Sequence, residues 1–478
     1  MQLPNHKTKI VCTIGPASRS KTILKRLIKG GMNVARLNFS HGSLEDQREN
    51  IHRIKSVANQ LNQTVAILID LPGPKIRIGN LQCEPLTLKK GHNVSLTTEN
   101  IPGTESLISV NYEKLPVSVA KGSKILLNDG FIQLKVLEIS GQEVKCKVMI
   151  GGQLLSHKGL NLPKAKMFLN VITDRDLEFV DFGLSEGVNT FSVSFVEKAA
   201  DILKVKQFAR ERGKSIYTVA KIERAEAVKN IDELLEVTDA VMVARGDLGD
   251  QIPIEEVPII QKKIIHKANL LGRPAVTATQ MLGSMVENIR PTRAEATDVA
   301  NAILDGTDAV MLSEETAIGK YPVEALEMMT KIAVSVERQQ KTVGFASGPG
   351  AYFKIAAGRK KTSVEDVISM NVLEATHQLD IRFILAPTNT GNTPRRISRV
   401  RPDSWILSFC RDKSKHDFLS FTYGVHPVLI ENKVDNWPEF LLKFIKDSGL
   451  TRKGQKVILT LGAGQSGGTD SLRVMVLP

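Results

Sequence analysis

Eight short apolar runs, rich in β-branched residues, recur along this 478-residue sequence and constrain its fold more than any other feature. They cover residues 9–15, 33–40, 65–71, 190–196, 215–223, 240–248, 274–281 and 309–316. Segments of helical periodicity, such as 199–212 and 257–271, separate them. Eight alternations of strand and helix predict an α/β fold, a (β/α)8 TIM barrel, whose strands are buried on both faces. A doubly wound open sheet is the structural alternative.

Polar side chains enter these runs repeatedly at the C-terminal end. A TIM barrel carries its active site at the C-terminal face of its strands, so the set as a whole favours the barrel and predicts a ring-shaped site. Any one of these residues could be an ordinary polar residue at a strand end. They are Thr13, Arg36, Asn38, Ser40, Asp70, Ser194, Lys221, Glu223, Asp247, Thr279, Gln280, Ser313 and Glu315.

Two regions differ in composition and hydrophobic periodicity from the barrel pattern. Between the third and fourth runs, turn glycines and alternating stretches at 125–136 and 144–150 indicate a β-rich insertion. After about residue 340, a segment at 344–361 rich in glycine, alanine and basic residues precedes a new series of helices and strands. We therefore predict a barrel at 1–71 and 170–340, an inserted domain at 72–169 and a C-terminal α/β domain at 341–478.

Lys221, Glu223 and Asp247 form the strongest local constellation. Lys221 and Glu223 are two residues apart on a strand, so they face the same space. A buried structural ion pair is the common alternative for such residues. However, carboxylates from two adjacent strand ends, Glu223 and Asp247, could share Mg²⁺ while phosphate oxygens and water complete its shell. Gly246 would permit close backbone approach, and N–H groups at a following helix start would bind an anion.

Two further segments carry candidate ligands. Arg36, Asn38 and Ser40 project to one face of their strand, where arginine supplies a fork for a phosphoryl group and the two oxygens could hold a cation. The next strand ends at Asp70 and leaves through prolines and a glycine, which a simple turn would explain. Such a turn would not explain the clustering of Asp70 with Lys75 and Arg77.

One loop of the C-terminal domain is a candidate anion site. It comprises Thr388, Asn389, Thr390, Gly391, Asn392 and Thr393, followed by Pro394. Proline after such caps marks a helix start, so the loop is either an anion site or a well-capped helix. The adjacent basic run of Arg395, Arg396, Arg399 and Arg401 is more typical of a solvated face than of a nucleic-acid patch, because no aromatic residues interleave it.

Charge and cysteine content narrow the classes of protein. The formal net charge of +13 suits nucleic acid, an anionic membrane or small phosphorylated substrates. The four cysteines are scattered without metal-ligand spacing, so we expect neither disulfides nor zinc but a reducing cytoplasm. No run of about eighteen apolar residues and no apolar leader occurs, so we expect no membrane partner and no export.

The motifs at 9–18, 31–42, 158–163, 221–223, 243–249, 278–281 and 290–295 resemble those of pyruvate kinases. They lie in family order along the chain, with the weakest resemblance after about residue 340. The resemblance implies Mg²⁺-dependent (or Mn²⁺-dependent) phosphoryl transfer from phosphoenolpyruvate to ADP, giving pyruvate and ATP in the last step of glycolysis. It also implies a cytoplasmic homotetramer with allosteric regulation, in which the insertion is a small β-barrel-like lid and the C-terminal domain is regulatory.

The resemblance also implies residue roles that agree with the chemistry above. Lys221 and Arg36 would neutralise the transferring phosphoryl group, Thr279 would lie where the enolate is protonated, and Glu223 and Asp247 would hold Mg²⁺. The substrate-binding set is Arg36, Lys221, Ala244, Arg245, Gly246, Asp247 and Thr279. The nucleotide-binding set is Thr13, Pro16, Asn38, His41, Arg77 and Lys158. The monovalent-cation position involves Asn38, Ser40, Asp70 and Leu71. The effector set, for a phosphorylated sugar or a nucleotide, is Thr388, Asn389, Thr390, Gly391, Asn392 and Thr393.

Three departures from the family pattern carry predictions. Lys75 stands where many members have the glutamate that accompanies a required K⁺, so we expect its ammonium to fill the monovalent-cation position and K⁺ to be unnecessary. Glu314 replaces a glycine near the expected nucleotide end and leaves nucleotide preference open. The stretch at 344–361 has no counterpart in the family pattern.

Two other functions remain as alternatives. A metal-dependent aldolase or lyase acting on pyruvate enolate would use the same barrel, but it would not need Lys221 beside a phosphoryl site or a lid carrying Lys158. A catalytically silent RNA-binding or effector-binding protein would account for the basic charge. The presence of Arg36, Lys221 and Glu223 together argues against such a loss of activity.

Overall fold

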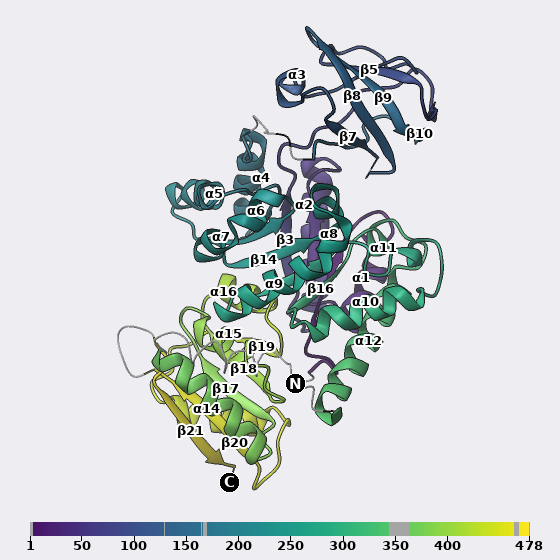
Figure 1. Ribbon diagram of the computed structural model, residues 1–478. Helices are drawn as coiled ribbons and strands as arrows, with labels where there is room; N and C mark the ends of the chain where they lie inside the picture. The colour runs from purple at the N-terminus through teal and green to yellow at the C-terminus, as the bar shows by residue number, and fades with distance from the viewer. Residues whose placement is uncertain are drawn as a thin grey trace.

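The structure, a computed structural model, describes residues 3–128, 130–163, 165, 170–343, 363–462 and 468–477. The 344–361 segment therefore lies outside the described residues. Three bodies follow one another along the long axis of the molecule, with the inserted domain at one end, a barrel in the middle and the C-terminal domain at the other end (Figure 1).

The central body is a closed barrel of eight parallel strands, in the order β1-β16-β15-β14-β13-β12-β3-β2. The prediction of a TIM barrel rather than an open sheet is confirmed. The strands are β1 (Lys9–Thr13), β2 (Val34–Asn38), β3 (Ala66–Leu71), β12 (Thr190–Val193), β13 (Tyr217–Ile222), β14 (Ala240–Ala244), β15 (Ala275–Ala278) and β16 (Ala309–Leu312).

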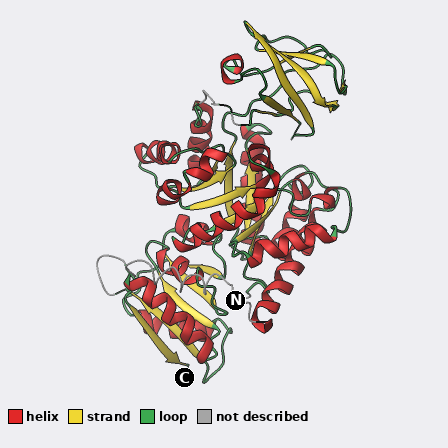
Figure 2. Cartoon of the chain, viewed as in Figure 1, coloured by secondary structure: helices red, strands yellow, loops and turns green. Residues whose placement is uncertain are grey.

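Helices surround these strands (Figure 2). They are α1 (Lys21–Gly30), α2 (Leu44–Gln60), α4 (Asp174–Ser185), α5 (Ala199–Glu211), α6 (Ala225–Lys229), α7 (Ile231–Val237), α8 (Arg245–Gln251), α9 (Val257–Leu270), α10 (Arg293–Leu304), α11 (Glu314–Ala317) and α12 (Pro322–Val343), with short 3₁₀ turns at Ile254–Glu256 and Gly283–Val286. Their ends follow local chemistry. The side chain of Ser20 caps α1, whose inner face buries Leu24, Leu27 and Ile28.

The predicted strand ends need one correction that matters for the site. The run at 240–248 is not one strand, because β14 ends at Ala244 and Arg245 begins helix α8. Asp247 consequently lies in the first turn of a helix, three residues after the last residue of β14, and not at a strand end as we expected. Glu315 likewise lies in α11, where its two carboxylate oxygens accept the backbone N–H groups of Leu282 and Ser313.

The insertion between β3 and β12 is a β-rich body with its own apolar core. A six-stranded sheet in the order β11-β7-β8-β9-β5-β6 and a two-stranded ribbon, β10-β4, surround this core. The elements are β4 (Leu86–Leu88), β5 (Asn93–Thr97), β6 (Leu107–Ser109), α3 (Leu115–Ser118), β7 (Lys124–Leu127), β8 (Ile132–Ser140), β9 (Glu143–Ile150), β10 (Gly152–Leu154) and β11 (Leu160–Asn161).

The C-terminal domain has a five-stranded sheet in the order β19-β18-β17-β20-β21, parallel except for β21. Along β17, Phe383 and Leu385 enter one apolar cluster and Ile384 enters another, so both faces of the sheet are covered. The elements are α14 (Val364–Gln378), β17 (Phe383–Pro387), α15 (Asn392–Ser398), β18 (Trp405–Cys410), α16 (Lys413–Leu419), β19 (Val425–Leu429), α17 (Trp437–Asp447), β20 (Lys456–Leu461) and β21 (Ser471–Val476).

Two phenylalanines of the C-terminal domain belong to the core of the barrel. Phe418 and Phe421 are almost completely buried and form one cluster with barrel-strand residues such as Val11, Val219 and Met242. Tyr217, the first residue of β13, stacks on Phe418 with ring centroids 4.2 Å apart. The C-terminal domain therefore closes the N-terminal mouth of the barrel, opposite the predicted site.

The prediction that the basic run is a solvated face is wrong. Arg395 and Arg399 are buried, and the run binds the two domains together. Arg399 donates to the carbonyl of Leu270 at 2.8 Å, and Arg401 donates to the carbonyl of Gly306. Arginine suits this position because its fixed fork of donors can satisfy several carbonyl groups at one interface.

No helix among the described residues is long and apolar enough to cross a membrane.

Candidate active site

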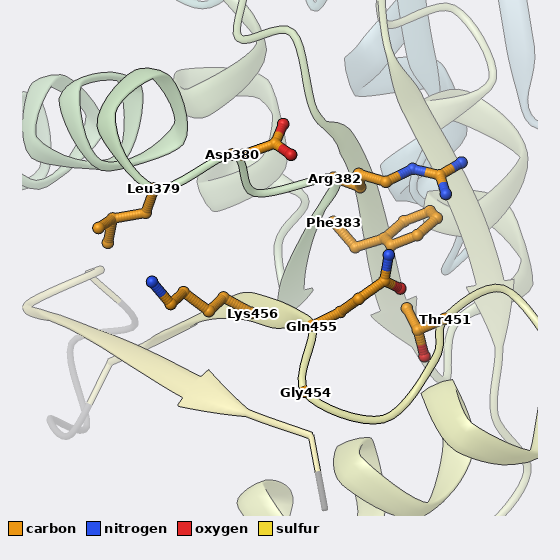
Figure 3. Close-up of a pocket in the computed structure, with 8 residues that line it drawn as sticks. All are labelled: Leu379, Asp380, Arg382, Phe383, Thr451, Gly454, Gln455 and Lys456. Atoms are coloured by element: carbon orange, nitrogen blue, oxygen red, sulfur yellow. The ribbon is translucent and has the colours of Figure 1, made fainter.

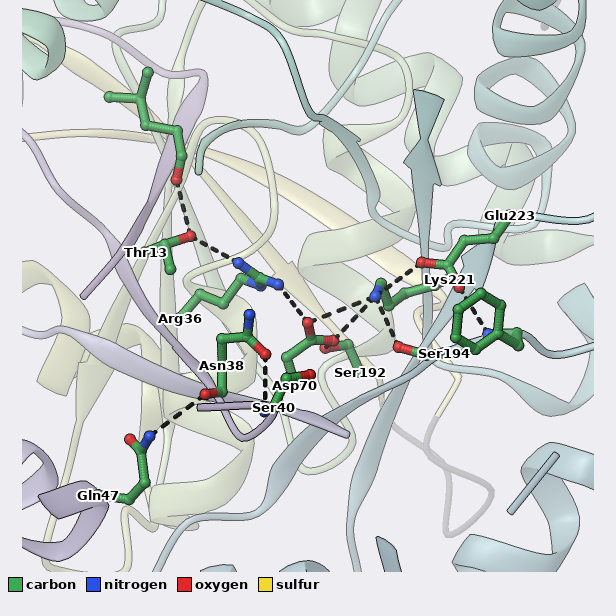
Figure 4. Close-up of polar contacts among 12 residues, drawn as sticks. Thr13, Arg36, Asn38, Ser40, Gln47, Asp70, Ser192, Ser194, Lys221 and Glu223 are labelled. Atoms are coloured by element: carbon green, nitrogen blue, oxygen red, sulfur yellow. Dashed lines mark hydrogen bonds and ion pairs between the residues drawn. The ribbon is translucent and has the colours of Figure 1, made fainter. Parts of the chain in front are cut away.

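The polar residues at the C-terminal ends of the barrel strands are called the rim below. One connected network within the rim comprises Thr13, Arg36, Asp70, Ser192, Ser194, Lys221 and Glu223, and Asn38 and Ser40 form a separate group with Gln47 (Figure 4). Asp70 is the centre of the connected network. Strand register places Asp70 between Asn38 on β2 and Ser192 on β12. Its carboxylate pairs with Arg36, accepts a hydrogen bond from Ser192 Oγ at 2.5 Å and lies 3.4 Å from Lys221 Nζ. Because this buried carboxylate lies between Arg36 and Lys221, it holds both cationic side chains in place.

Lys221 is held as a buried ammonium. Its Nζ lies 2.8 Å from Glu223 Oε1 and 2.7 Å from Ser194 Oγ. Burial alone would lower the pKa of Lys221, but Asp70 and Glu223 outweigh burial and raise that pKa above its ordinary value. The same surroundings lower the pKa of Asp70 to about 2, because the attraction of Arg36 and Lys221 exceeds the effect of burial. Lys221 therefore presents a full positive charge at neutral pH.

Glu223 and Asp247 line the same cavity, which has a volume of about 550 Å³. Burial raises the pKa of Glu223, Lys221 opposes this, and the negative charge of Asp247 adds to the rise. The prediction that these two carboxylates converge on one space agrees with this placement. Both carboxylates can offer hard oxygen donors to one cation, Glu223 from just after the end of β13 and Asp247 from the first turn of α8.

The residues present fit a magnesium ion. Glu223 Oε1 is buried and receives no hydrogen bond of normal geometry from any described residue, although Lys221 lies near it. Within the described ranges, no three His, Cys, Asp or Glu side chains form a closed metal cage. Mg²⁺ characteristically takes one or two protein carboxylates and fills its remaining positions with water and substrate phosphate oxygens.

Thr279 and the start of α8 form a rigid corner of the rim. The Thr279 hydroxyl accepts the N–H of Gly246 at 2.8 Å and donates to the Ala278 carbonyl at 2.7 Å. Arg245 donates to the Thr279 carbonyl at 2.7 Å and pairs with Asp298. Thr279 has φ of +67°, which is costly for a β-branched residue, so the surrounding contacts hold it in that conformation.

The predicted nucleotide-binding residues are divided between the barrel and the insertion, and none of them lines the large cavity. Thr13 is buried and accepts from Arg36 Nη1 at 2.9 Å, whereas Pro16 and His41 are exposed on loops that follow β1 and β2. Arg77 and Lys158 belong to the insertion, where Arg77 donates to the carbonyl of His157 at 2.8 Å. Partial burial lowers the pKa of His41, and the nearby cations Arg77, Lys75 and Arg36 lower it further.

The contacts at the predicted monovalent-cation position are not those we expected. The contacts of the Asp70 carboxylate with described residues come from Arg36, Lys221 and Ser192, and Lys75 is not among them. Lys75 lines the large cavity instead. Its Cε packs against Gly159, where the Cβ of a larger residue would lie 3.4 Å from it. Asn38 and Ser40 do lie together, because Asn38 Oδ1 accepts the N–H of Ser40 at 3.0 Å, and Leu71 ends β3.

The predicted effector residues form the turn that follows β17 and, with Asn392 and Thr393, the start of α15. Gly391, with φ of +78°, caps α15 and its N–H is bound by Thr388 Oγ1 at 2.8 Å. Arg395 donates back to the carbonyl of Gly391 and to Asn392 Oδ1. A hollow of about 240 Å³ on the same domain is lined by residues such as Asp380, Arg382 and Lys456 (Figure 3), and none of the six predicted effector residues lines it.

Sequence reasoning missed two contributors to the rim. Ser192 binds Asp70, and the backbone N–H of Phe195 binds Glu223 Oε2 at 2.7 Å. Ser192 lies two residues before Ser194, so strand periodicity could have found it. Phe195 could not have been found, because its contribution is a backbone group presented at φ of +58°.

Residues 5–326 match the family described as "Pyruvate kinase, barrel domain". The chain belongs to the pyruvate kinase family. Residues 366–475 match the description "Pyruvate kinase, alpha/beta domain", so the resemblance seen in the motifs is confirmed in both parts.

Individual relatives agree with this family. A pyruvate kinase of Thermococcus litoralis is 47% identical over 480 residues and covers both chains completely. A pyruvate kinase of Staphylococcus epidermidis is 43% identical over 98% of this chain and 80% of its own. A crystal structure of a pyruvate kinase from Cryptosporidium parvum has a TM-score of 0.90 at 36% identity, covering 99% of this chain and 97% of that one. As a pyruvate kinase family member, the chain is a phosphotransferase.

Proposed function

We propose that this chain transfers the phosphoryl group of phosphoenolpyruvate to ADP in a Mg²⁺-dependent reaction, giving pyruvate and ATP as the last step of glycolysis. The observation that carries the proposal is the charged Lys221, which is fixed by Asp70 and by Glu223, a residue that lines the large cavity together with Asp247. Family membership favours this reaction over an aldolase or lyase and over a silent binding protein.

The rim supplies what phosphoryl transfer needs, which is positioning and neutralisation of charge. Lys221 and Arg36 direct their positive charges at the oxygens of the group in transfer. Their partner Asp70 holds both before substrate arrives, so no reorganisation is needed during the reaction. The start of α8, from Ala244 to Asp247, binds the substrate carboxylate, and Thr279, which holds the Gly246 N–H, lies where the enolate is protonated.

Glu223 and Asp247 would hold the magnesium ion. When bound, the ion supplies Lewis-acid neutralisation of phosphoryl and carboxylate oxygens. The nucleotide lies between Thr13, Pro16, Asn38 and His41 on the barrel and Arg77 and Lys158 on the insertion. The insertion then acts as a lid, because its closure brings Lys158 to the phosphates and excludes water.

A coupled assay for pyruvate tests the reaction. We expect turnover with phosphoenolpyruvate, ADP and Mg²⁺ or Mn²⁺, and none after removal of divalent metal by chelation. Turnover in the absence of any divalent metal, or pyruvate formation that does not depend on ADP, would contradict the proposal.

K⁺ should not be required, since Lys75 replaces the glutamate that accompanies K⁺ in other members and adds a positive charge to the cavity that Glu223 and Asp247 line. We expect saturating velocities in tetramethylammonium chloride and in KCl to agree within about twofold. A difference of this size is what the exchange of one cation for another at exposed charges on the protein surface can cause. A tenfold or larger drop without K⁺ would refute this. Lys75→Glu is the matched variant, and it should make the velocity depend on K⁺.

A phosphorylated sugar or nucleotide should act as an effector at the loop formed by Thr388, Asn389, Thr390, Gly391, Asn392 and Thr393. Support comes from exposed Asn389, Thr390 and Asn392 beside the buried cation Arg395. Thr390→Glu should abolish activation by such an effector, because its carboxylate repels the phosphate, while the basal rate stays similar. Asn436→Glu on the same domain is the control. Unchanged activation in Thr390→Glu would exclude this site. The homotetramer stays a prediction, which sedimentation equilibrium can check.

A further inference from the structure

Asp250, a residue of α8, contacts two separate segments of the insertion. The side-chain amide of Asn161, on β11, donates to Asp250 Oδ2. The other oxygen of the same carboxylate, Oδ1, faces Gly130. If another residue replaced this glycine, its Cβ would lie only 2.9 Å from Oδ1. Asp250 therefore has one carboxylate oxygen directed at each of two lid segments that are far apart in the sequence.

The two lid segments are themselves joined. β11 pairs with β7, and the N–H of Asn128 donates to the carbonyl of Gly159 at 3.2 Å. Gly130 has φ of +83°, a conformation that glycine adopts without strain, so this edge can approach the helix closely. Because hydrogen bonds within the sheet link the two segments, Asn161 and Gly130 should move together when the insertion moves relative to α8.

Asp250 also lies close to the chemistry along its own helix. It follows Asp247 by three residues, which is nearly one helical turn, and Asp247 lines the large cavity together with Asn161 and Glu223. On the insertion, Lys158 precedes Asn161 by three residues. The contact thus joins the helix that carries a proposed metal ligand to the strand next to a proposed nucleotide ligand.

We propose that Asp250 is the docking point of the insertion on the barrel and a positioning residue for phosphoryl transfer. It acts through Asn161, which sets the distance of Lys158 from the rim. This inference rests on the proposed function. Lid closure is a general expectation, and the new element is the residue pair that fixes the closed position. The pair consists of a carboxylate acceptor and an amide donor, and reversing the two residues would preserve it.

Asp250→Ala should lower kcat/KM for ADP about fivefold to tenfold, because a hydrogen bond to a charged acceptor is lost. The KM for phosphoenolpyruvate should stay within about twofold, since its ligands lie on the barrel rim. Asn161→Asp, which sets two carboxylates against each other, should impair the enzyme at least as much. The exchanged pair Asn161→Asp with Asp250→Asn restores one donor and one acceptor and should recover most of the loss.

Two controls separate docking from general damage. Asp232→Ala removes a surface carboxylate of another short barrel helix, which pairs with Lys267 at 2.7 Å, and it should leave kinetics unchanged. Amide hydrogen exchange of Leu160 and Asn161 should accelerate in Asp250→Ala and recover in the exchanged pair. This readout needs no activity, so it also tests docking if the proposed reaction fails. Unchanged exchange in Asp250→Ala, or an exchanged pair as impaired as either single variant, would overturn the inference.

Discussion

Lys221→Met is expected to lower kcat for phosphoryl transfer by roughly two to three orders of magnitude, the cost of removing one preorganised charge-stabilising group. Lys221 is the only described residue whose ammonium contacts Asp70 and Glu223 together. Methionine keeps most of the aliphatic side chain and removes the charge. The measurement is steady-state kinetics at saturating phosphoenolpyruvate, ADP and Mg²⁺.

The fold should survive this substitution. Arg36 continues to pair with Asp70, and Glu223, whose pKa burial already raises, can take up a proton when the ammonium is gone. Lys206→Met is the matched control, because Lys206 is also a partly buried lysine, paired with Asp239 at 2.7 Å, but lies away from the rim. A Lys221→Met enzyme with wild-type turnover would remove the role assigned to this lysine.

Phe421→Ala should have the largest effect on stability, lowering the free energy of unfolding by about 3–5 kcal/mol, the usual cost of truncating a buried aromatic side chain. The Phe421 ring is completely buried in the cluster that fills the barrel. Its removal leaves a cavity at the junction of two domains, where Phe418 and Tyr217 cannot move in without losing their stacking contact.

Calorimetric unfolding of the full chain measures this effect, followed as the shift of the transition temperature because a chain of several domains need not unfold in two states. Phe131→Ala serves as the control, since Phe131 is 72% exposed and its truncation should change little. An unchanged transition in Phe421→Ala would mean that the C-terminal domain does not stabilise the barrel through this contact.

The barrel and most of its rim could be predicted because their signals are local. Strand periodicity and apolar character depend on neighbouring residues, so Arg36, Asp70, Lys221 and Glu223 could be assigned to strand ends before any contact was known. The position of Asp247 on a helix could not, because α8 is only seven residues long and contains two glycines, so it has too little apolar periodicity to mark a helix. Hydrophobicity does not reveal that turn.

The sequence by itself determined the order of strands and helices, the family, and which residue types meet at the barrel rim, since these depend on short-range periodicity and on motifs. Tertiary structure alone decided that Asp70 bridges Arg36 and Lys221, that Arg395 and Arg399 are buried between domains, and that Asp250 receives the insertion. The physical reason is distance along the chain. Asp70 and Lys221 are 151 residues apart, and Asn161 and Asp250 are 89 apart, so only the folded backbone brings the side chains of each pair together.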